Sequence, residues 1–239
     1  MRNVLVTGAS RGLGLAMARR LAADGFRVHA VARKASDEVL ALSSETGAVH
    51  FHAFDLLDVD GLPALARRLR ADFGPLYGLV NNAGIGTSGL LTTMPQGQIE
   101  ALIRLNTLSP ILLTRAVARS MLAQGSGRIV NVSSIVASTG FKALSVYSAT
   151  KASLVGFTRS LARELGAVGV TVNAVAPGFI DTEMTDVMDE GTKDQVVRRS
   201  ALRRLAVAGD VAAAVAFLLS DDARNITGTV LTVDAGATA

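Results

Sequence analysis

The sequence predicts an α/β protein built on a doubly wound parallel sheet with helices on both faces. Seven short apolar runs alternate with segments of helical periodicity along the 239 residues. The runs are continuously apolar, which is typical of parallel strands buried on both faces. The hydrophobic content of 49% supplies a substantial core, and no Pro/Gly/Ser-rich or charged linker divides the chain. We therefore expect a single domain over residues 1–239.

The predicted elements follow one another in order. Helical periodicity covers residues 15–23, 62–73, 98–108 and 145–165. The apolar runs predict strands at residues 4–6, 28–32, 49–54, 79–80, 129–132, 170–175 and 230–233. Ligands of such sheets bind beyond the carboxyl ends of the strands. The residues that follow each strand are therefore the candidates for function.

Composition argues against several classes of function. The net charge is +4 from 24 basic and 20 acidic residues, and aromatic residues make up only 4% of the chain, which argues against a nucleic-acid partner. No cysteine is present, so neither a disulfide framework nor a cysteine-bound metal can form. No apolar run approaches the ~20 residues of a membrane helix. A strand-like run starts at Asn3, before any signal peptide could fit, so we expect a soluble, cytoplasmic protein with no membrane partner.

A glycine-rich loop follows the first strand and opens into a helix. Glycines let backbone amides approach a pyrophosphate, whose charge the helix N-terminus stabilises. The spacing is one residue longer than the usual dinucleotide fingerprint, so an ordinary turn remains an alternative. The candidate cofactor-binding residues in this loop are Gly8, Ser10, Arg11, Gly12, Leu13 and Gly14.

The end of the second strand bears on the choice of cofactor. A carboxylate at this place favours NAD, whereas an arginine accommodates the 2′-phosphate of NADP. Here Arg33 and Lys34 follow the strand, and Arg11 in the glycine loop can reach the same group. The sequence therefore favours NADP over NAD, although a solvated strand end and the nearby Asp37 keep NAD as an alternative.

The third and fourth strands end in further candidates. Asp55 and Leu56 suit either an adenine contact or a helix-capping turn. Asn82, Ala83 and Gly84 follow Asn81 as small or amide residues, which suit either close passage of a cofactor or a hydrogen-bond network that fixes the backbone. Earlier in the third strand His50 and His52 share one face, and since no third ligand is evident we expect packing or surface histidines and no metal site.

Four polar residues form the candidate catalytic set. Tyr147 and Lys151 lie one helical turn apart, so an ammonium near the phenol is expected to lower the tyrosine pKa from ~10 toward neutral pH. The pair is typical of a general acid and base. Ser134 ends the fifth strand, where its hydroxyl can share a substrate oxygen with Tyr147. Asn106 sits among apolar residues of a helix, so its amide is either structural or part of a proton relay through water.

Together these residues resemble the short-chain dehydrogenase/reductase family across essentially the whole chain. The motifs match in order and spacing: Thr7-Gly8-x-x-x-Gly12-x-Gly14, Asn81-Asn82-Ala83-Gly84, Asn106, Ser134, Tyr147-x-x-x-Lys151, and Pro177-Gly178 followed by Thr182. Within the family the chain is most similar to bacterial 3-oxoacyl-[acyl-carrier-protein] reductases. Asn131-Val132-Ser133-Ser134 and residues 175–180 carry much of this likeness.

The resemblance implies a Rossmann fold and a role for each matched residue. Tyr147 would be the acid/base, Ser134 would polarise the carbonyl, Lys151 would hold the nicotinamide ribose and lower the tyrosine pKa, and Asn106 would support a proton relay. Asp55 would lie near the adenine and Asn82 near its ribose. The nicotinamide contacts would be Pro177, Gly178, Ile180 and Thr182.

The implied function is NADPH-dependent reduction of a carbonyl to an alcohol, with a 3-oxoacyl thioester as the expected substrate. Gly125 and Val168 stand where carrier-dependent members tend to have basic residues, which argues against an acyl carrier protein as partner. The resemblance also implies a substrate lid at residues 181–204 and a homotetramer or homodimer. The alternatives are an alcohol, sugar or steroid dehydrogenase of the same family, or a non-catalytic dinucleotide-binding protein.

Overall fold

The computed structural model describes residues 1–180 and 190–239, and within them seven strands form one parallel sheet. The strand order is β3-β2-β1-β4-β5-β6-β7, with the crossover between β1 and β4 that marks a doubly wound sheet. This confirms the predicted fold class. The strands are β1 (Asn3–Thr7), β2 (Arg27–Ala32), β3 (Val49–Ala53), β4 (Leu76–Asn81), β5 (Gly127–Val132), β6 (Val170–Pro177) and β7 (Val230–Val233).

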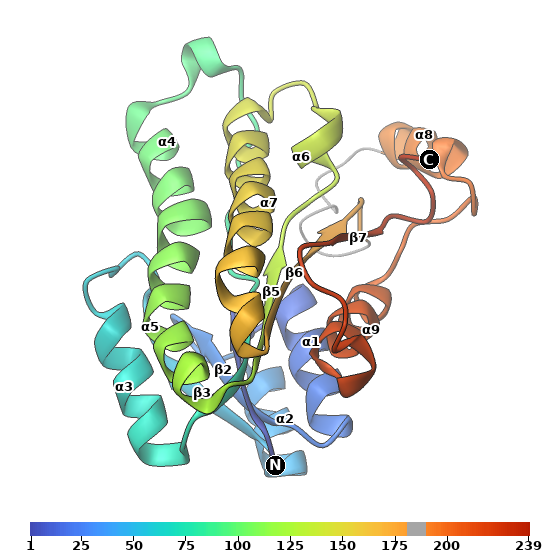
Figure 1. Ribbon diagram of the computed structural model, residues 1–239. Coiled ribbons are helices and arrows are strands. Elements are labelled where there is room, and N and C mark those ends of the chain that lie inside the picture. Colours follow the sequence, from blue (N-terminus) through green and yellow to red (C-terminus); the bar gives the residue numbers. More distant parts are fainter. Residues whose placement is uncertain (181–189) are drawn as a thin grey trace.

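Helices cover both faces of the sheet (Figure 1). On one side lie α3 (Leu62–Phe73), α5 (Ser109–Gln124) and α7 (Ser145–Leu165), whose apolar residues form one core with Leu5, Leu79 and Ile129 of the sheet. On the other side α1 (Gly12–Ala23), α2 (Asp37–Thr46) and α9 (Ala208–Leu219) form the second core. Strands buried on both faces account for the continuously apolar runs in the sequence.

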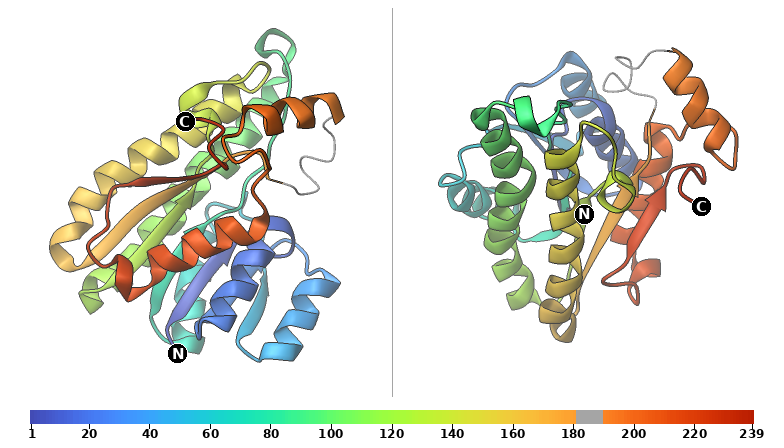
Figure 2. Two further views of the ribbon diagram at one scale, coloured as in Figure 1. Left: turned by 90° about the vertical axis from the view of Figure 1, so that its right-hand side faces the viewer. Right: turned by 90° about the horizontal axis from the view of Figure 1, so that it is seen from above.

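Three further helices lie near the carboxyl ends of the strands (Figure 1). They are α4 (Gln96–Ile103), the short α6 (Val136–Thr139) and α8 (Glu190–Arg199). Figure 2 shows the N-terminus at one end of the molecule and α8 at the other, with the end of the chain returning beside α8. Backbone amides of Ala201 and Leu202 bond the carbonyls of Gly236 and Ala235 at 3.3 and 3.0 Å, which fixes this return.

Two differences from the predicted elements have local causes. Strand β4 starts at Leu76, whereas the predicted strand starts at residue 79, because Gly78 interrupts the apolar pattern. A Cβ on Gly78 would lie 2.9 Å from a methyl group of Val4 and 3.2 Å from one of Leu219. The predicted helix at 98–108 is instead α4 followed by a π-helical turn, Arg104–Leu108. No helix within residues 1–180 and 190–239 has the length and apolar content to span a bilayer.

Candidate active site

The parallel sheet brings the candidate residues to one edge. Strands β1, β4, β5 and β6 are neighbours, so their carboxyl ends lie side by side. The glycine loop follows β1, Asn82 follows β4, Ser134 follows β5, and Gly178 follows β6. Residues as far apart in the chain as Gly8 and Gly178 therefore border a single region, as the strand order at a switch point requires.

Tyr147, Lys151 and Ser134 come together at this edge. Tyr147 and Lys151 lie one turn apart near the start of α7, and the Lys151 Nζ is 5.7 Å from the centre of the Tyr147 ring. The hydroxyl of Ser134 lies close enough to the phenol of Tyr147 to lower its pKa through hydrogen bonding. Two hydroxyl groups and an ammonium thus share one site, an arrangement able to bind a carbonyl oxygen and give it a proton.

Lys151 is held rigidly, with only 4% of its surface exposed. Its Nζ donates to the carbonyl of Val132 at 2.8 Å, and the Ser133 Oγ donates to the backbone carbonyl of Lys151 at 2.8 Å. These bonds fasten α7 to the end of β5. Burial lowers the pKa of Lys151 to about 8, because the ammonium has lost most of its water.

The expected lowering of the tyrosine pKa is wrong for this structure. Burial raises the pKa of Tyr147 above its usual range, and the hydrogen bond with Ser134 offsets this only in part. The sequence argument considered the ammonium alone, whereas desolvation of the phenolate is the larger effect. The Lys151 Nζ also donates its hydrogen bond to the backbone carbonyl of Val132. The phenol is therefore protonated at neutral pH, the form that donates a proton.

Asn106 lies inside the π-helical turn and is 1% exposed. Its Oδ1 accepts from the amide of Ile85 at 3.0 Å, and its Nδ2 donates to the Ile85 carbonyl at 2.9 Å and to Thr150 Oγ1 at 3.2 Å. A Cβ on Gly84 would lie 3.2 Å from this Oδ1 and 3.4 Å from Lys151 Nζ. Asn106 therefore ties the segment after β4 to α7, and a relay role stays a prediction.

The glycine loop is shaped by close contacts that only glycine permits. Gly8 has a φ of +67°, and its amide donates to Val31 at 2.7 Å. A Cβ on Gly14 would lie 2.1 Å from the Gly8 carbonyl oxygen and 2.7 Å from Asn82 Nδ2. By contrast, a Cβ on Gly12, at the start of α1, would meet nothing within 4 Å. The loop is thus tightly packed at Gly8 and Gly14 and unobstructed at Gly12, which fits a pyrophosphate at the helix N-terminus.

Asn82 links this loop to β4. Its Nδ2 donates to the carbonyl of Thr7 at 2.8 Å and more weakly to that of Gly8 at 3.3 Å. The amides of Asn82 and Ala83 both donate to Thr7 Oγ1 at 3.0 Å. This leaves Asn82 as a structural clamp on the loop, while a contact with the cofactor ribose stays a prediction.

The basic side chains expected to choose NADP lie where the sequence placed them. Arg33 and Lys34 follow β2 and are exposed, and Arg11 is exposed at the start of α1. Ser36 caps α2 and its Oγ donates to the carbonyl of Ser10, which holds the two loops against each other. Leu13 is partly buried and packs against the core.

The other predicted contacts divide into three groups. Asp55 Oδ1 accepts from the Leu57 amide at 3.0 Å, which supports the capping turn, and Leu56 is buried in the core. The backbone of Gly178 donates to Val233 at 2.9 Å, while Pro177 ends β6 and Ile180 packs into the core. Thr182, like the first half of the predicted lid, lies outside the described residues; residues 190–199 of that lid form α8.

Sequence reasoning did not identify the side-chain partners of the buried amides that support the site. Asn81 Nδ2 donates to Asn131 Oδ1 at 2.8 Å, and Asn131 Nδ2 donates to Thr158 Oγ1 at 2.8 Å. This chain runs from β4 through β5 to α7 and fixes the helix that carries Tyr147. The signal was present in the sequence, because an asparagine within an apolar strand must find a partner when buried.

The three histidines form a cluster on β2 and β3, on the face of the sheet that α3 covers. His29 Nδ1 lies 3.2 Å from His52 Nε2, and His29 Nε2 lies 3.3 Å from Asn3 Oδ1. Phe73 packs over all three rings. Among residues 1–180 and 190–239, no group of three or more His, Cys, Asp or Glu side chains is arranged to hold a metal ion.

Comparisons with known proteins agree with this geometry. A family model described as enoyl-(acyl carrier protein) reductase matches residues 8–238. The chain is 41% identical to the 3-oxoacyl-[acyl-carrier-protein] reductase FabG of Haemophilus influenzae, over 97% of this chain and 96% of that protein. Among solved structures it resembles ElxO with NADP bound, with a TM-score of 0.92, 32% identity, and 99% and 98% of the two chains covered. It also resembles a gluconate 5-dehydrogenase from Burkholderia cenocepacia in complex with NADP and tartrate, with a TM-score of 0.94, 30% identity, and 99% and 95% covered.

Proposed function

The chain belongs to the short-chain dehydrogenase/reductase family, and on that premise we propose that it is an NADPH-dependent reductase that converts a ketone to an alcohol. The substrate we propose is a 3-oxoacyl thioester, the class of substrate in the name of its FabG relative. The observation that carries the proposal is the meeting of Ser134, Tyr147 and the buried Lys151 at the carboxyl edge of the sheet.

The side chains divide the work of reduction among them. NADPH, when bound, supplies the hydride. The hydroxyls of Ser134 and Tyr147 bind the carbonyl oxygen, and the Tyr147 phenol donates its proton to that oxygen as it gains negative charge. The raised pKa of Tyr147 keeps the phenol protonated until that moment. The ammonium of Lys151 stabilises the phenolate that remains.

The residues present fit a dinucleotide. The loop from Gly8 to Gly14 would hold the pyrophosphate. The tight packing at Gly8 and Gly14 and the free space at Gly12 support this. Arg33, with Arg11 and Lys34, would bind the 2′-phosphate, since guanidinium groups match phosphate oxygens in geometry. Asp55, Leu56, Ala83 and Gly84 would border the adenosine half, and Pro177, Gly178, Ile180 and Thr182 the nicotinamide. The NADP-bound neighbours support this assignment.

A second candidate is a sugar or alcohol dehydrogenase of the same family. The gluconate 5-dehydrogenase neighbour favours it, because that protein shares the fold at 30% identity. Comparing reduction of keto esters with reduction of keto sugar acids separates the two. A non-catalytic dinucleotide-binding protein is disfavoured, since simple binding would not need a buried lysine beside a tyrosine.

We also propose that the enzyme is a cytoplasmic homodimer or homotetramer. Exposed apolar side chains on the outer face of the α4–α5 region support assembly, among them Ile103, Leu108 and Leu122. A groove of about 390 Å³ beside Ile103 is lined by Leu91, Ile99 and Val146. Reduction rates with acetoacetyl thioesters of acyl carrier protein, of coenzyme A and of a simple thiol decide which carrier the enzyme uses.

The experiment follows loss of NADPH absorbance with acetoacetyl thioesters, β-keto esters and keto sugar acids. Tyr147→Phe should lower kcat by roughly 10²- to 10⁴-fold, the usual contribution of a general acid, while NADPH still binds. Tyr77→Phe makes the same change at the only other tyrosine, whose hydroxyl donates to Leu219 at 2.9 Å, far from the site. That control should keep its activity and lose about 1 kcal/mol of stability. Full activity in Tyr147→Phe would end the proposal.

A further inference from the structure

A partly exposed aromatic side chain lies in the segment between Ser134 and Tyr147. Phe141 follows α6 and is 48% exposed, although large apolar side chains are normally buried. Its ring meets that of Phe179 edge to face, with centroids 5.6 Å apart and planes at 63°. This is a favourable geometry for two aromatic rings. The contact leaves much of the Phe141 ring available to another molecule.

The backbone holds Phe141 in a tight and strained turn. Gly140 has a φ of +69° and Ala143 a φ of +65°, a left-handed conformation that alanine rarely adopts. The amide of Leu144 donates to the Phe141 carbonyl at 3.1 Å, and the amide of Gly89 donates to Ala143 at 2.9 Å. Strain of this kind persists only where the surrounding structure enforces it, and it gathers at functional sites.

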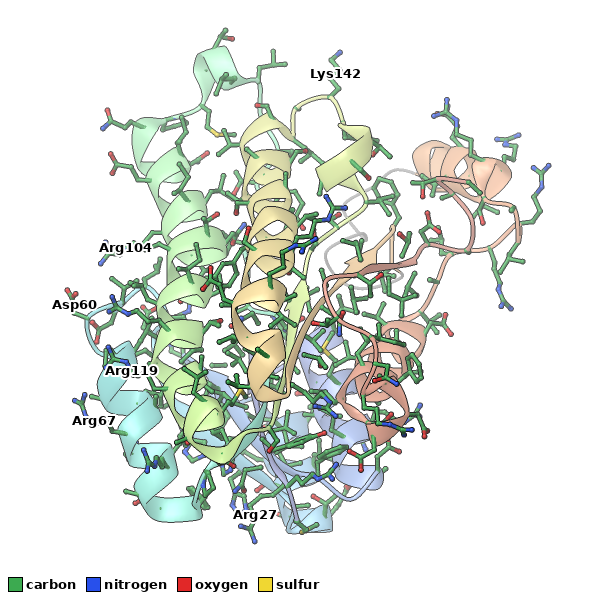
Figure 3. All side chains as sticks on the ribbon, viewed as in Figure 1. Arg27, Asp60, Arg67, Arg104, Arg119 and Lys142 are labelled. Carbon is green, nitrogen blue, oxygen red and sulfur yellow. The ribbon has the colours of Figure 1, made fainter. Side chains whose placement is uncertain are left out.

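The two phenylalanines belong to the segments on either side of the catalytic groups. Phe141 lies between Ser134 and Tyr147 in the chain, and Phe179 comes directly after Gly178 at the end of β6. The amide of Ile135 bonds the carbonyl of Pro177 at 3.0 Å, which joins the roots of these two segments. The neighbouring Lys142 projects outward from the top of the molecule (Figure 3). The aromatic pair therefore bridges the two borders of the site.

We propose that Phe141 and Phe179 form an apolar clamp for the group next to the reacting carbonyl. The clamp makes the enzyme prefer ketones that carry a flat aromatic or an unbranched apolar group over polyhydroxylated ketones. An apolar group gains by covering the exposed ring of Phe141, whereas sugar hydroxyls would lose water there without finding a partner. The inference rests on the proposed reductase function and narrows its substrate class.

The test compares kcat/KM for ethyl benzoylacetate, ethyl acetoacetate and 5-ketogluconate. Wild-type enzyme should prefer the aromatic ester to the small one, and both to the keto sugar acid. Phe141→Ala should reduce the preference for the aromatic ester by roughly two- to tenfold, the effect of losing one aromatic contact, with NADPH affinity unchanged. Phe141→Leu should keep part of the preference, and Lys142→Ala, at the exposed neighbour, should keep all of it.

Two outcomes separate this inference from the proposed function. Ketone reduction that depends on Tyr147 but shows the same substrate ratios in wild type and Phe141→Ala would overturn the clamp alone. Wild-type enzyme that reduces none of the ketones while binding NADPH would overturn the reductase function and the clamp with it. Because Phe141 is half exposed, its variants should melt close to wild type, and Phe179→Ala gives a second, independent removal of the pair.

Discussion

Replacing Gly14 by alanine should disable the cofactor site while leaving the fold largely in place. The new Cβ would lie 2.1 Å from the Gly8 carbonyl oxygen and 2.7 Å from Asn82 Nδ2, so either the loop or α1 must move by about an ångström. Such overpacking costs about 1–3 kcal/mol. For a chain of this size that corresponds to a fall in Tm of roughly 2–12 °C.

The displacement falls on the loop proposed to bind the pyrophosphate, so NADPH affinity should drop at least roughly tenfold, the effect of losing one or two backbone hydrogen bonds to an anion. NADPH fluorescence titration and thermal melting measure the two effects. Gly156→Ala is the matched control, because a Cβ there meets nothing within 4 Å and alanine favours the middle of α7. If Gly14→Ala binds NADPH within twofold of wild type, the assignment of this loop is refuted.

Three further predictions concern charge. Arg33→Ala should weaken NADPH binding by roughly 10- to 100-fold, the usual worth of a charge-assisted bond, and leave NADH binding unchanged; equal effects on both would contradict the NADP assignment. Burial lowers the pKa of Lys151 to about 8, so the ammonium loses its proton above that pH. The kcat for reduction should therefore stay constant near neutrality and fall above about pH 8. A pH profile of kcat that is flat into the alkaline range would contradict this. Burial lowers the pKa of His29 to about 3 and of His52 to about 4, so below pH 6.5 the unfolded chain binds protons that the folded chain does not. The free energy of unfolding should therefore fall by about 2 kcal/mol for His29 between pH ~6.5 and ~5, measured by urea midpoints, and His29→Leu should remove that part of the slope.

The sequence pattern was sufficient to predict the sheet, because strands buried on both faces are largely restricted to apolar residues. All seven apolar runs became strands, and the prediction of a doubly wound sheet is confirmed. The first half of β4 was not predicted because Gly78 interrupts the apolar run. A glycine is needed there because the strand and a helix are in close contact, and glycine itself does not indicate a strand. That the chain forms a single domain remains a prediction.

The candidate site was predictable where chain spacing fixes geometry. Tyr147 and Lys151 are one turn apart on a helix, so their proximity follows from the sequence alone. The tyrosine pKa did not follow, because it depends on how deeply the fold buries the phenol. The bonds from Asn131 and Ser133 to α7 were also hidden, since each joins elements brought together only by the sheet.

The π-helical turn at Arg104–Leu108 has a consequence for how α4 and α5 can vary. One extra residue shifts the phase of a helix by about 100°, so the faces of α4 and α5 are set independently of each other. Deleting a single residue here would restore a regular helix and rotate one of the two helices out of its packing. The same deletion would swing the Asn106 amide away from both backbone groups of Ile85. The extra residue in the π-helical turn therefore lets α4 and α5 follow each other without a break while each helix packs against different neighbours.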